Sequence, residues 1–494
     1  MSEKKVRIPL KRYEWPDEKK QKRTRIIQVS ILVISILLSV GFGYSLRSAF
    51  IDEKVVPVQT VSKLNRVEAI FDVLMNEWYF GRNQEDLETQ LIEDAIDGMI
   101  DGTGDIHTSY MNAEEVTAFT EAINRNFVGI GVSYFDNNGT FIVERVFIGS
   151  PAESAGVLPG DIIKNVDGVS TTGLTSDELA DRVRGEENTV VTIDFQRGEE
   201  IVTLDITRGV IRNTAFGRMI DNDTAYLEIY QFGEDTGAEV DQYMQLFKDS
   251  GAKDIIIDLR DNGGGYLSTL EEIGSMFVPK DGILIQQEIY SGEKLVSKSS
   301  GNIMVEFDEI IILVNENSAS ASEVLTAAIK ENMEATIVGV TTYGKGTVQQ
   351  QHAFSDGSAL KYTVAEWLTP NGNHINGVGI NPDVMVDLHP VMHEPFSELS
   401  DDEAYGYDTV HESVKDAQLA LDFLGYKVDR TDGYFSSKTL SALESYIKDY
   451  KLEDESVINK VLLDKLKSEV VRIWNLEKLE KDVQLKKALE LIND

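Results

Sequence analysis

The 494-residue sequence contains no cysteine. Disulfide bonds, thiol nucleophiles and thiolate metal sites are therefore excluded, and every exported domain must be held together by core packing. Histidine is scarce, with six residues, and neither the H-E-x-x-H pattern of zinc proteases nor the G-x-S-x-G turn of α/β-hydrolases occurs. Nothing in the sequence calls for a metal ion or another cofactor, and we expect none.

Basic residues are also few, with 47 Lys and Arg against 84 Asp and Glu, which gives a net charge of −37. Ten of the basic residues and four of the acidic ones lie in residues 1–25, so the remainder carries −43. Such an acidic region repels phosphates, which argues against nucleic-acid binding, and its usual consequence is solubility.

Residues 26–46 form a run of 21 residues without a formal charge. As a helix this run would span about 31 Å, enough to cross a bilayer, and the basic leader 1–25 should then stay in the cytoplasm. A cleaved signal peptide is the alternative, but the leader is long and residues 45–49 make a poor cleavage signal. We therefore expect a single-pass cell-membrane protein whose remaining domains are extracytoplasmic.

The rest of the chain predicts a multidomain α+β protein. Residues 47–125 are expected to be helical, and five apolar side chains suggest a stripe that would cover a sheet or pair subunits in a homodimer or higher oligomer. These residues are Leu64, Ala69, Ile70, Val73 and Leu74.

Two short runs rich in β-branched side chains, residues 309–314 and 335–340, indicate buried parallel strands, and residues 321–332 between them indicate a helix. A strand-helix-strand unit places both carboxyl ends at one edge of the sheet. Ser320 and Lys345 follow these ends and are 25 residues apart. We therefore expect the hydroxyl and the amine to meet in the crevice where α/β sheets bind ligands.

A third predicted strand, residues 254–259, precedes the glycine run 263–265 and a helix over 267–278. Its loop should reach the same crevice. Backbone amides of Gly263 and Gly264 could approach a substrate carbonyl, because glycine has no Cβ in the way. The alternative is an ordinary turn between a strand and a helix.

A serine becomes a nucleophile when an adjacent base takes its proton, and lysine can be that base only as a neutral amine. Lowering its pKa from about 10.4 to about 7–8 costs about 3–4 kcal/mol, which burial can supply. In an extended segment Lys345, Thr347 and Gln349 share a face, so Gln349 could orient the amine. The start of the following helix offers free N–H groups for an oxyanion.

Other interpretations stay open at these positions. Lys345 could be a solvated loop residue, and Ser320 could simply cap its helix. A phosphate-binding loop at 339–345 is disfavoured because position 346 is Gly rather than Ser or Thr, and no helix follows. His352 or His374 could be a base, but neither lies in a loop with a matching acidic partner.

Residues 126–211 change to short strands and resemble a PDZ domain, mainly through Ser150-Pro-Ala followed by Gly160-Asp-Ile-Ile163. Such domains add a peptide to a sheet edge and bind its terminal carboxylate on amides of a glycine loop. Gly129, Ile130 and Gly131 are the candidates for that loop, and a plain turn without a ligand is the alternative.

Residues 65–390 resemble the carboxyl-terminal processing proteases, which are serine/lysine peptidases. The resemblance is carried by Asp258-Leu-Arg-Asp-Asn-Gly-Gly-Gly265, Asn315-Glu-Asn-Ser-Ala-Ser-Ala-Ser-Glu323, Thr342-Tyr-Gly-Lys-Gly-Thr-Val-Gln349, Thr369-Pro-Asn-Gly372 and Gly379-Ile-Asn-Pro-Asp383. One departure is Asp105-Ile106, where relatives usually carry Asp-Pro.

The resemblance implies that Ser320 is the nucleophile, Lys345 the general base and Gln349 the residue that holds the lysine. It implies oxyanion donors at Ala321 and the 263–265 turn, and a PDZ domain that gates a protease core at 212–392. Arg184 would be a sensor of the bound peptide, with an ordinary surface arginine as the alternative.

Residues 393–410 indicate a linker, and residues 411–470 resemble a three-helix peptidoglycan-binding module through Leu424-Gly-Tyr426 and Asp432-Gly-Tyr-Phe435. A helical cap or a dimer contact is the alternative. Residues 471–494, within a charged amphipathic run that begins at 469, are expected to form one helix.

The sequence therefore predicts a membrane-anchored serine endopeptidase that binds the C-terminal tails of proteins through its PDZ domain and cleaves near them through an acyl-enzyme. The alternative is a catalytically silent scaffold that binds peptides and cell wall.

Overall fold

The structure is a computed structural model that describes residues 63–124, 127–137, 139–211, 214–393, 396–400, 402–452 and 456–493. The chain divides into two units between Asp94 and Ala95. The predicted leader 1–25 and membrane helix 26–46 lie outside the described residues. Within the described ranges, no helix combines the length and apolar character needed to span a bilayer.

The first unit contains α2 (Lys63–Glu77), the short η1 (Gly81–Asn83) and the start of α3 (Leu87–Asp101). Helix α2 buries none of its residues, so the apolar stripe expected around Ile70 is exposed in this chain. In the second unit, α4 (Ala113–Asn124) continues the helical pattern. The prediction of helices is thus confirmed for α2, α3 and α4, but β1 (Ser109–Met111) interrupts it.

The PDZ region is a sheet in the order β3-β4-β5-β7-β8, with β6 attached to β5. Helices α5 (Pro151–Ala155) and α6 (Ser176–Val183) lie beside it, and β2 (Phe127–Gly129) pairs with β9 (Gly209–Ile211). The strands of the sheet are β3 (Val132–Asn137), β4 (Thr140–Val146), β5 (Ile162–Val166), β6 (Val169–Ser170), β7 (Val190–Arg197) and β8 (Glu200–Thr207). Its core holds fully buried Phe141, Ile193 and Phe195.

A second sheet, in the order β10-β11-β12-β15-β16-β19, forms the protease core. The strands from β11 to β19 are parallel and β10 is antiparallel. The strands are β10 (Ala215–Met219), β11 (Thr224–Ile229), β12 (Asp254–Asp258), β15 (Ile310–Val314), β16 (Thr336–Gly339) and β19 (Val384–Met385). The parallel strands predicted at 254–259, 309–314 and 335–340 are confirmed.

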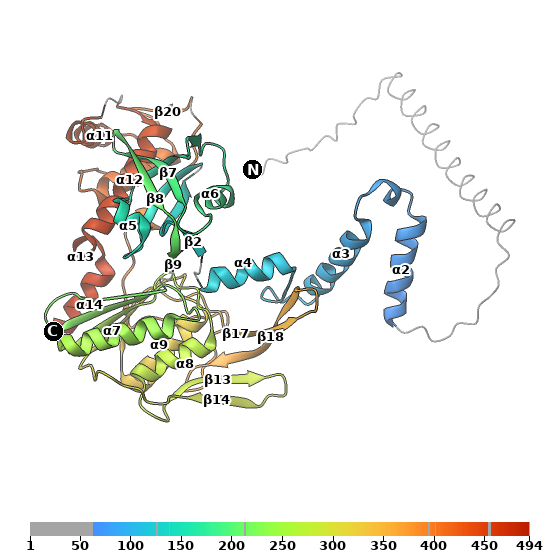
Figure 1. The fold of residues 1–494 in the computed structure, drawn as a ribbon. Helices are drawn as coiled ribbons and strands as arrows, with labels where there is room; N and C mark the ends of the chain where they lie inside the picture. The colour runs from blue at the N-terminus through green and yellow to red at the C-terminus, as the bar shows by residue number, and fades with distance from the viewer. Residues whose placement is uncertain are drawn as a thin grey trace, which may run out of the picture. The chain divides into compact units, whose positions relative to one another are not determined.

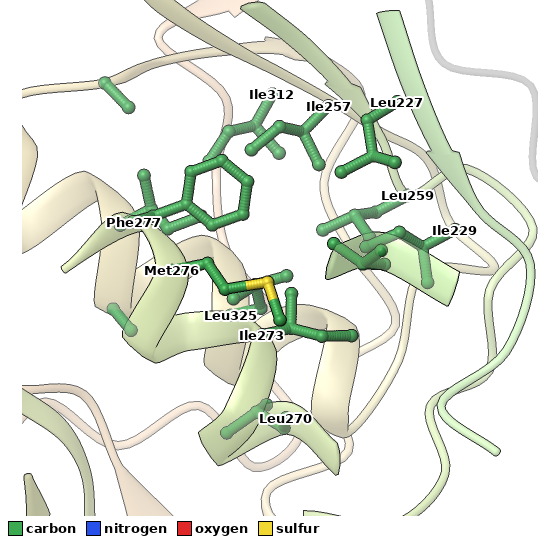
Figure 2. Close-up of a cluster of buried hydrophobic side chains, with 14 of the residues drawn as sticks. Leu227, Ile229, Ile257, Leu259, Leu270, Ile273, Met276, Phe277, Ile312 and Leu325 are labelled. Atoms are coloured by element: carbon green, nitrogen blue, oxygen red, sulfur yellow. The ribbon is translucent and has the colours of Figure 1, made fainter. Parts of the chain in front are cut away.

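Helices α7 (Thr236–Ser250), α8 (Leu267–Phe277) and α9 (Ala321–Met333) pack on one face of this sheet (Figure 1). Leu227, Ile257 and Ile312 from adjacent strands meet Ile273 and Leu325 from α8 and α9 (Figure 2). The opposite face meets Leu485 and Ala488. Burial on both faces explains why these strands are continuous apolar runs rather than alternating ones.

A third sheet has the order β1-β18-β13-β14, and β17 also pairs with β18. Its strands are β13 (Ile283–Ile289), β14 (Lys294–Lys298), β17 (Thr347–Ala353) and β18 (Ala359–Leu368). Strand β17 begins two residues after Lys345. This sheet therefore supports the loop 340–346 that carries the lysine, called the lysine loop below.

The C-terminal region contains η2 (Pro390–Met392), α10 (Glu412–Phe423), α11 (Ser437–Asp449) and α12 (Lys460–Leu476), with β20 (Ala404–Tyr405) paired to β21 (Ile458–Asn459). Phe396 and Leu399, in the segment predicted as a linker, are buried in the core of these helices.

The prediction of one helix over 471–494 is wrong. Helix α12 ends at Leu476, and α13 (Lys478–Lys481) and α14 (Val483–Asn493) follow. The break has a local cause, because Asp482 Oδ1 accepts hydrogen bonds from the N–H groups of Gln484 (3.1 Å) and Leu485 (2.9 Å) and so caps α14.

Candidate active site

Ser320 lies where the chain leaves β15 and enters α9, and it is the N-cap residue of that helix. Its φ is +55°, an uncommon backbone conformation for a residue other than glycine. Backbone strain of this kind often accompanies functional sites. Ser320 is therefore both the N-cap residue of α9 and a strained position of its loop, so its place at the helix start does not argue against a catalytic role.

The two neighbouring serines have clear structural roles. Ser318 Oγ donates to the carbonyl of Leu259 at 2.7 Å, and Ser322 Oγ donates to the carbonyl of Asn262 at 2.8 Å. Both side chains are fully buried, whereas Ser320 is half-buried. Within the described part of the chain the Ser320 hydroxyl has no hydrogen-bond acceptor. Of the three serines, Ser320 alone is both accessible and uncommitted as a donor.

Glu323 joins the serine loop to the lysine loop. Its Oε2 accepts from the backbone N–H groups of Ser320 (2.8 Å) and Lys345 (2.9 Å). Its Oε1 accepts from Thr342 Oγ1 (2.6 Å) and from the N–H of Gly344 (2.7 Å). The carboxylate is fully buried, and four donors supply the hydrogen bonds that a buried charge needs. The fold therefore brings the backbones of Ser320 and Lys345 to one oxygen atom.

Lys345 is half-buried, and two influences lower the pKa of its amine below 10.5. The larger is burial, which disfavours the charged form, and the second is the positive charge of Lys361; Glu323 opposes them. The Lys345 carbonyl accepts from Trp367 Nε1 at 2.7 Å, which fixes the loop. Among the described residues, no hydrogen bond joins Lys345 Nζ to Ser320 Oγ.

The glycine turn lies directly against Ser320. Gly264 has φ +104°, and a Cβ there would stand 2.8 Å from Ser320 Cβ and 3.0 Å from the nitrogen of Ala321. Fully buried Asn262 holds the turn, because its Oδ1 accepts from the N–H of Gly264 (2.9 Å) and its Nδ2 donates to Ile229 (2.7 Å).

The three predicted oxyanion donors therefore differ. The N–H of Gly264 is committed to Asn262. In the part of the chain that the structure describes, the N–H groups of Gly263 and Ala321 have no acceptor. Ala321 opens α9, whose N-terminal dipole favours negative charge.

Gln349 is placed on β17, but it contacts another residue than expected. Its Nε2 donates to Thr347 Oγ1 at 2.8 Å, and it makes no hydrogen bond to Lys345 within the described ranges. Gln349 thus contacts Thr347, which was expected on the same face of the segment, and it does not contact the Lys345 amine.

In the PDZ region, Gly129 ends β2, and Ile130 is buried with its carbonyl accepting from the N–H of Ala152 at 2.8 Å. Gly131 has φ +83°, and a Cβ there would lie 2.4 Å from that of Ser150, so only glycine fits this turn. Arg184 is exposed at the end of α6.

Two residues of this site escaped the sequence analysis. Glu323 was visible only as the last residue of a Ser-x-x-Glu capping pattern, which does not show that it also binds the lysine loop. Asn262 was one letter in a glycine-rich run. Both act through contacts between segments far apart in sequence, and local pattern carries no signal for such contacts.

Comparison with known proteins identifies two regions of the chain. Residues 223–386 match the model of peptidase family S41, and residues 142–197 match a PDZ domain. The chain is 32% identical over 458 residues to a probable CtpA-like serine protease of Staphylococcus aureus (strain COL), covering 92% of this chain and 88% of that protein.

It is also 32% identical over 433 residues to the carboxy-terminal processing protease CtpA of Bacillus subtilis (strain 168), covering 87% of this chain and 90% of the relative. A photosystem II D1 C-terminal processing protease of known structure is 27% identical, with a TM-score of 0.42, over 66% of this chain and 92% of that one. The chain belongs to peptidase family S41, among the carboxy-terminal processing serine proteases, and it carries a PDZ domain.

Proposed function

We propose that the protein is a serine/lysine endopeptidase in which Ser320 is acylated and Lys345 is the base. The observation that carries the proposal is the bond of one Glu323 oxygen to the backbones of both residues. Half-burial of Lys345 supports it, because burial favours the neutral amine that a base requires.

The proposed reaction begins when the neutral Lys345 amine takes the proton of Ser320 Oγ while the oxygen attacks the substrate carbonyl. The N–H groups of Gly263 and Ala321 stabilise the resulting oxyanion. Lys345 then gives its proton to the leaving amine, and the C–N bond breaks to leave an acyl-enzyme. Water attacks this ester with Lys345 again as base, which releases the new carboxyl terminus and restores Ser320.

We further propose that Gln349 holds the lysine amine when substrate is bound, exchanging its bond to Thr347 for one to Lys345. A bond to the amine would require the Gln349 amide to change its orientation, and catalytic hydrogen bonds often tighten only in the substrate complex. The Gln349→Ala variant should therefore lose part of its activity rather than all of it.

For substrates we propose unstructured C-terminal tails of proteins, bound by the loop Gly129–Gly131 and added to the edge of the PDZ sheet. The turn that only glycine fits supports this role, and Arg184 would sense the bound tail. The PDZ region would gate the protease core.

The location of the protein is a proposal from sequence. The uncharged run 26–46 behind a basic leader supports a cell-membrane anchor with the catalytic region outside the cytoplasm. The peptidoglycan-like motifs near 424–435 support cell-wall binding by the C-terminal helices. The exposed apolar face of α2 supports self-association into a dimer or larger oligomer.

The test of the mechanism is to label the protein with a fluorophosphonate and to identify the modified residue by mass spectrometry. We expect label on Ser320. Ser320→Ala and Lys345→Ala should abolish cleavage of an unfolded substrate with the fold intact by circular dichroism. The exposed controls Ser291→Ala and Lys294→Ala should cleave normally.

Glu323→Gln tests the observation behind the proposal. An amide offers one accepting oxygen where the carboxylate serves four donors, so about 1–3 kcal/mol of stability and about tenfold or more of kcat should be lost. Glu334→Gln, at the exposed end of the same helix, is the control. Label at another residue, or full activity of Ser320→Ala, would reject the mechanism, and a chain without any label or turnover would be the silent scaffold.

A further inference from the structure

A buried cluster of charges lies at the start of α14, which covers the face of the parallel sheet opposite to the one covered by α9. Its centre is Arg260, whose side chain is 7% exposed. The guanidinium binds Asp258 through Nε (2.9 Å) and Nη2 (2.6 Å), and it binds Asp482 through Nη1 (3.0 Å) and Nη2 (2.7 Å). Both carboxylates are at most 2% exposed. One buried cation is therefore shared by two carboxylates from segments more than 200 residues apart.

Asp482 lies at the break between α13 and α14. The same carboxylate that binds Arg260 also caps α14 through the N–H groups of Gln484 and Leu485. Gln484 adds a further bond, because its Oε1 accepts from Arg260 Nη1 at 3.0 Å. The start of the last helix is thus built around the guanidinium.

Arg260 stands two residues before Asn262, which holds the turn beside the nucleophile. The backbone N–H of Arg260 donates to Asp258 Oδ1 at 3.1 Å, so side chain and backbone are fixed together. The intervening Asp261 has φ +59°, and its Oδ1 accepts from the amides of Asn315 (2.8 Å) and Asn317 (2.9 Å). Hydrogen bonds therefore hold each residue from 258 to 262. A displacement of Arg260 would be expected to displace the backbone of the glycine turn that follows.

We propose that the C-terminal segment α13–α14, acting through Asp482 on Arg260, positions the glycine turn against Ser320. The inference rests on the proposed function, because the turn matters only if it supplies an oxyanion donor. Asp482 is a positioning residue, since it touches neither the nucleophile nor the base. The catalytic centre would then be complete only when the last helix of the chain is docked on the sheet.

The same segment also reaches the PDZ region. Lys478 of α13 donates to Tyr226 OH (3.1 Å), which in turn donates to Asp258 (2.7 Å). Lys478 also lies 3.7 Å from Glu228, whose carboxylate pairs with Arg145 of β4 at 2.9 Å. Figure 1 shows α12, α13 and α14 running from beside the PDZ strands to the parallel sheet. These contacts border a cavity of about 450 Å³ that neither Ser320 nor Lys345 lines.

The test is the variant Asp482→Asn, which keeps the size of the side chain and leaves Arg260 paired with Asp258, so the fold should persist. Active sites are titrated with the fluorophosphonate, and kcat is expressed per titrated site. We expect kcat to fall about tenfold or more with KM within about twofold, because a displaced donor weakens the transition state rather than substrate binding. Inhibition by a peptide aldehyde, which forms the same oxyanion, should weaken by a similar factor.

A purely structural role would give a different result, namely fewer titratable sites with normal kcat at each. Glu490→Gln on the exposed side of α14 is the matched control and should match the wild type in every measurement. Gln484→Leu removes one neutral bond to Arg260 and should lower kcat by about two- to fivefold. If Asp482→Asn fails to fold, the kcat of Gln484→Leu per titrated site decides whether the positioning role holds.

Wild-type kcat per site in Asp482→Asn, or in Gln484→Leu when the first variant is unfolded, would overturn the positioning role. Because the wild-type protein is labelled in the same experiment, that outcome differs from a failure of the mechanism, in which Ser320 of the wild type would carry no label.

Discussion

The amine of Lys345 faces charges of both signs from several elements. Lys361 of β18 disfavours its protonated form, whereas Glu323 of α9 favours it. His107, in the loop before β1, interacts electrostatically with both Lys345 and Lys361. Burial and the charges of these two lysines lower the pKa of its ring below 6.5, and Asp105 opposes this effect. The imidazole is therefore neutral near pH 7, and Lys361 is the main nearby cation that acts on Lys345.

This arrangement predicts a pH profile. If Lys345 is the base, kcat/KM should rise with pH as the amine loses its proton, with an inflection below 10.5. Lys361→Met removes a positive neighbour, so the protonated amine becomes less costly and the pKa of Lys345 rises. The inflection should then move to higher pH, and activity at pH 7 should fall.

The measurement is kcat/KM on a peptide substrate across pH 5–10, a range of about five units that spans the expected titration. Lys294→Met, a replacement of an exposed lysine on β14, should leave the profile in place. A shift to lower pH in Lys361→Met, or no shift at all, would contradict the electrostatic role of Lys361.

At the scale of elements, the glycine turn and the start of α9 act as one unit. Gly264 combines a positive φ with a position where a Cβ would strike Ser320. Backbone strain and displacement of the Ser320 side chain are separate effects, and a second glycine of the chain would show the strain without the displacement. Gly292, in the turn between β13 and β14, has φ +81° and open space around it.

We therefore predict that Gly264→Ala loses about 1–2 kcal/mol from backbone strain and, in addition, about 100-fold or more in kcat because Ser320 is pushed aside. Gly292→Ala should lose similar stability with normal kcat. Urea unfolding and steady-state kinetics on both variants separate the two effects. Equal kcat in both would mean that the turn does not set the position of Ser320.

Elements with regular patterns were predictable from sequence. The strands β12, β15 and β16 and the helices α8 and α9 appear where apolar runs and periodicity placed them, because burial on both faces leaves a continuous signal. The edge that brings Ser320 and Lys345 together followed from the strand-helix-strand unit, which makes the two strands parallel and places both carboxyl ends at one edge of the sheet. Strand β1 was missed, since three residues in a helical context carry too little pattern.

The break at residues 477–482 was missed for another reason. The charged and apolar residues of α12 and α14 continue one amphipathic pattern across it, so periodicity alone joins them. Asp482, which caps α14, is also bonded to Arg260, and this contact between distant segments leaves no trace in the local pattern. The same limit applied to Glu323, whose partners in the lysine loop are set by the tertiary fold.

At the scale of the whole molecule, the C-terminal helices hold the PDZ region as well as the protease core. Asp464 of α12 makes two polar contacts to the PDZ region, because Oδ1 accepts from Asn137 Nδ2 (2.9 Å) and Oδ2 accepts from Thr140 Oγ1 (2.8 Å). Closer to the C-terminal end of α12, Asn475 Nδ2 donates to the carbonyl of Glu144 at 3.0 Å. A protease gated by its PDZ region needs a contact of this kind that can be made and broken.

We predict that Asp464→Ala loosens the β3–β4 hairpin, because the donors of Asn137 and Thr140 lose their acceptor in a part-buried contact. A loss of about 1.4 kcal/mol in local stability corresponds to about tenfold faster amide exchange where opening limits protection. Hydrogen exchange read by mass spectrometry should show this acceleration over residues 132–146, with β11, β12 and β15 unchanged.

Asp432→Ala is the matched control, because Asp432 is an exposed carboxylate of the same helical region whose partner is Arg430. It should leave exchange of the hairpin at the wild-type rate. Faster exchange throughout the parallel sheet of Asp464→Ala would show that the two regions unfold as one unit and would argue against independent movement of the PDZ region. Acceleration limited to the hairpin would mean that the PDZ region can leave α12 while the protease core stays folded, which is the freedom that gating requires.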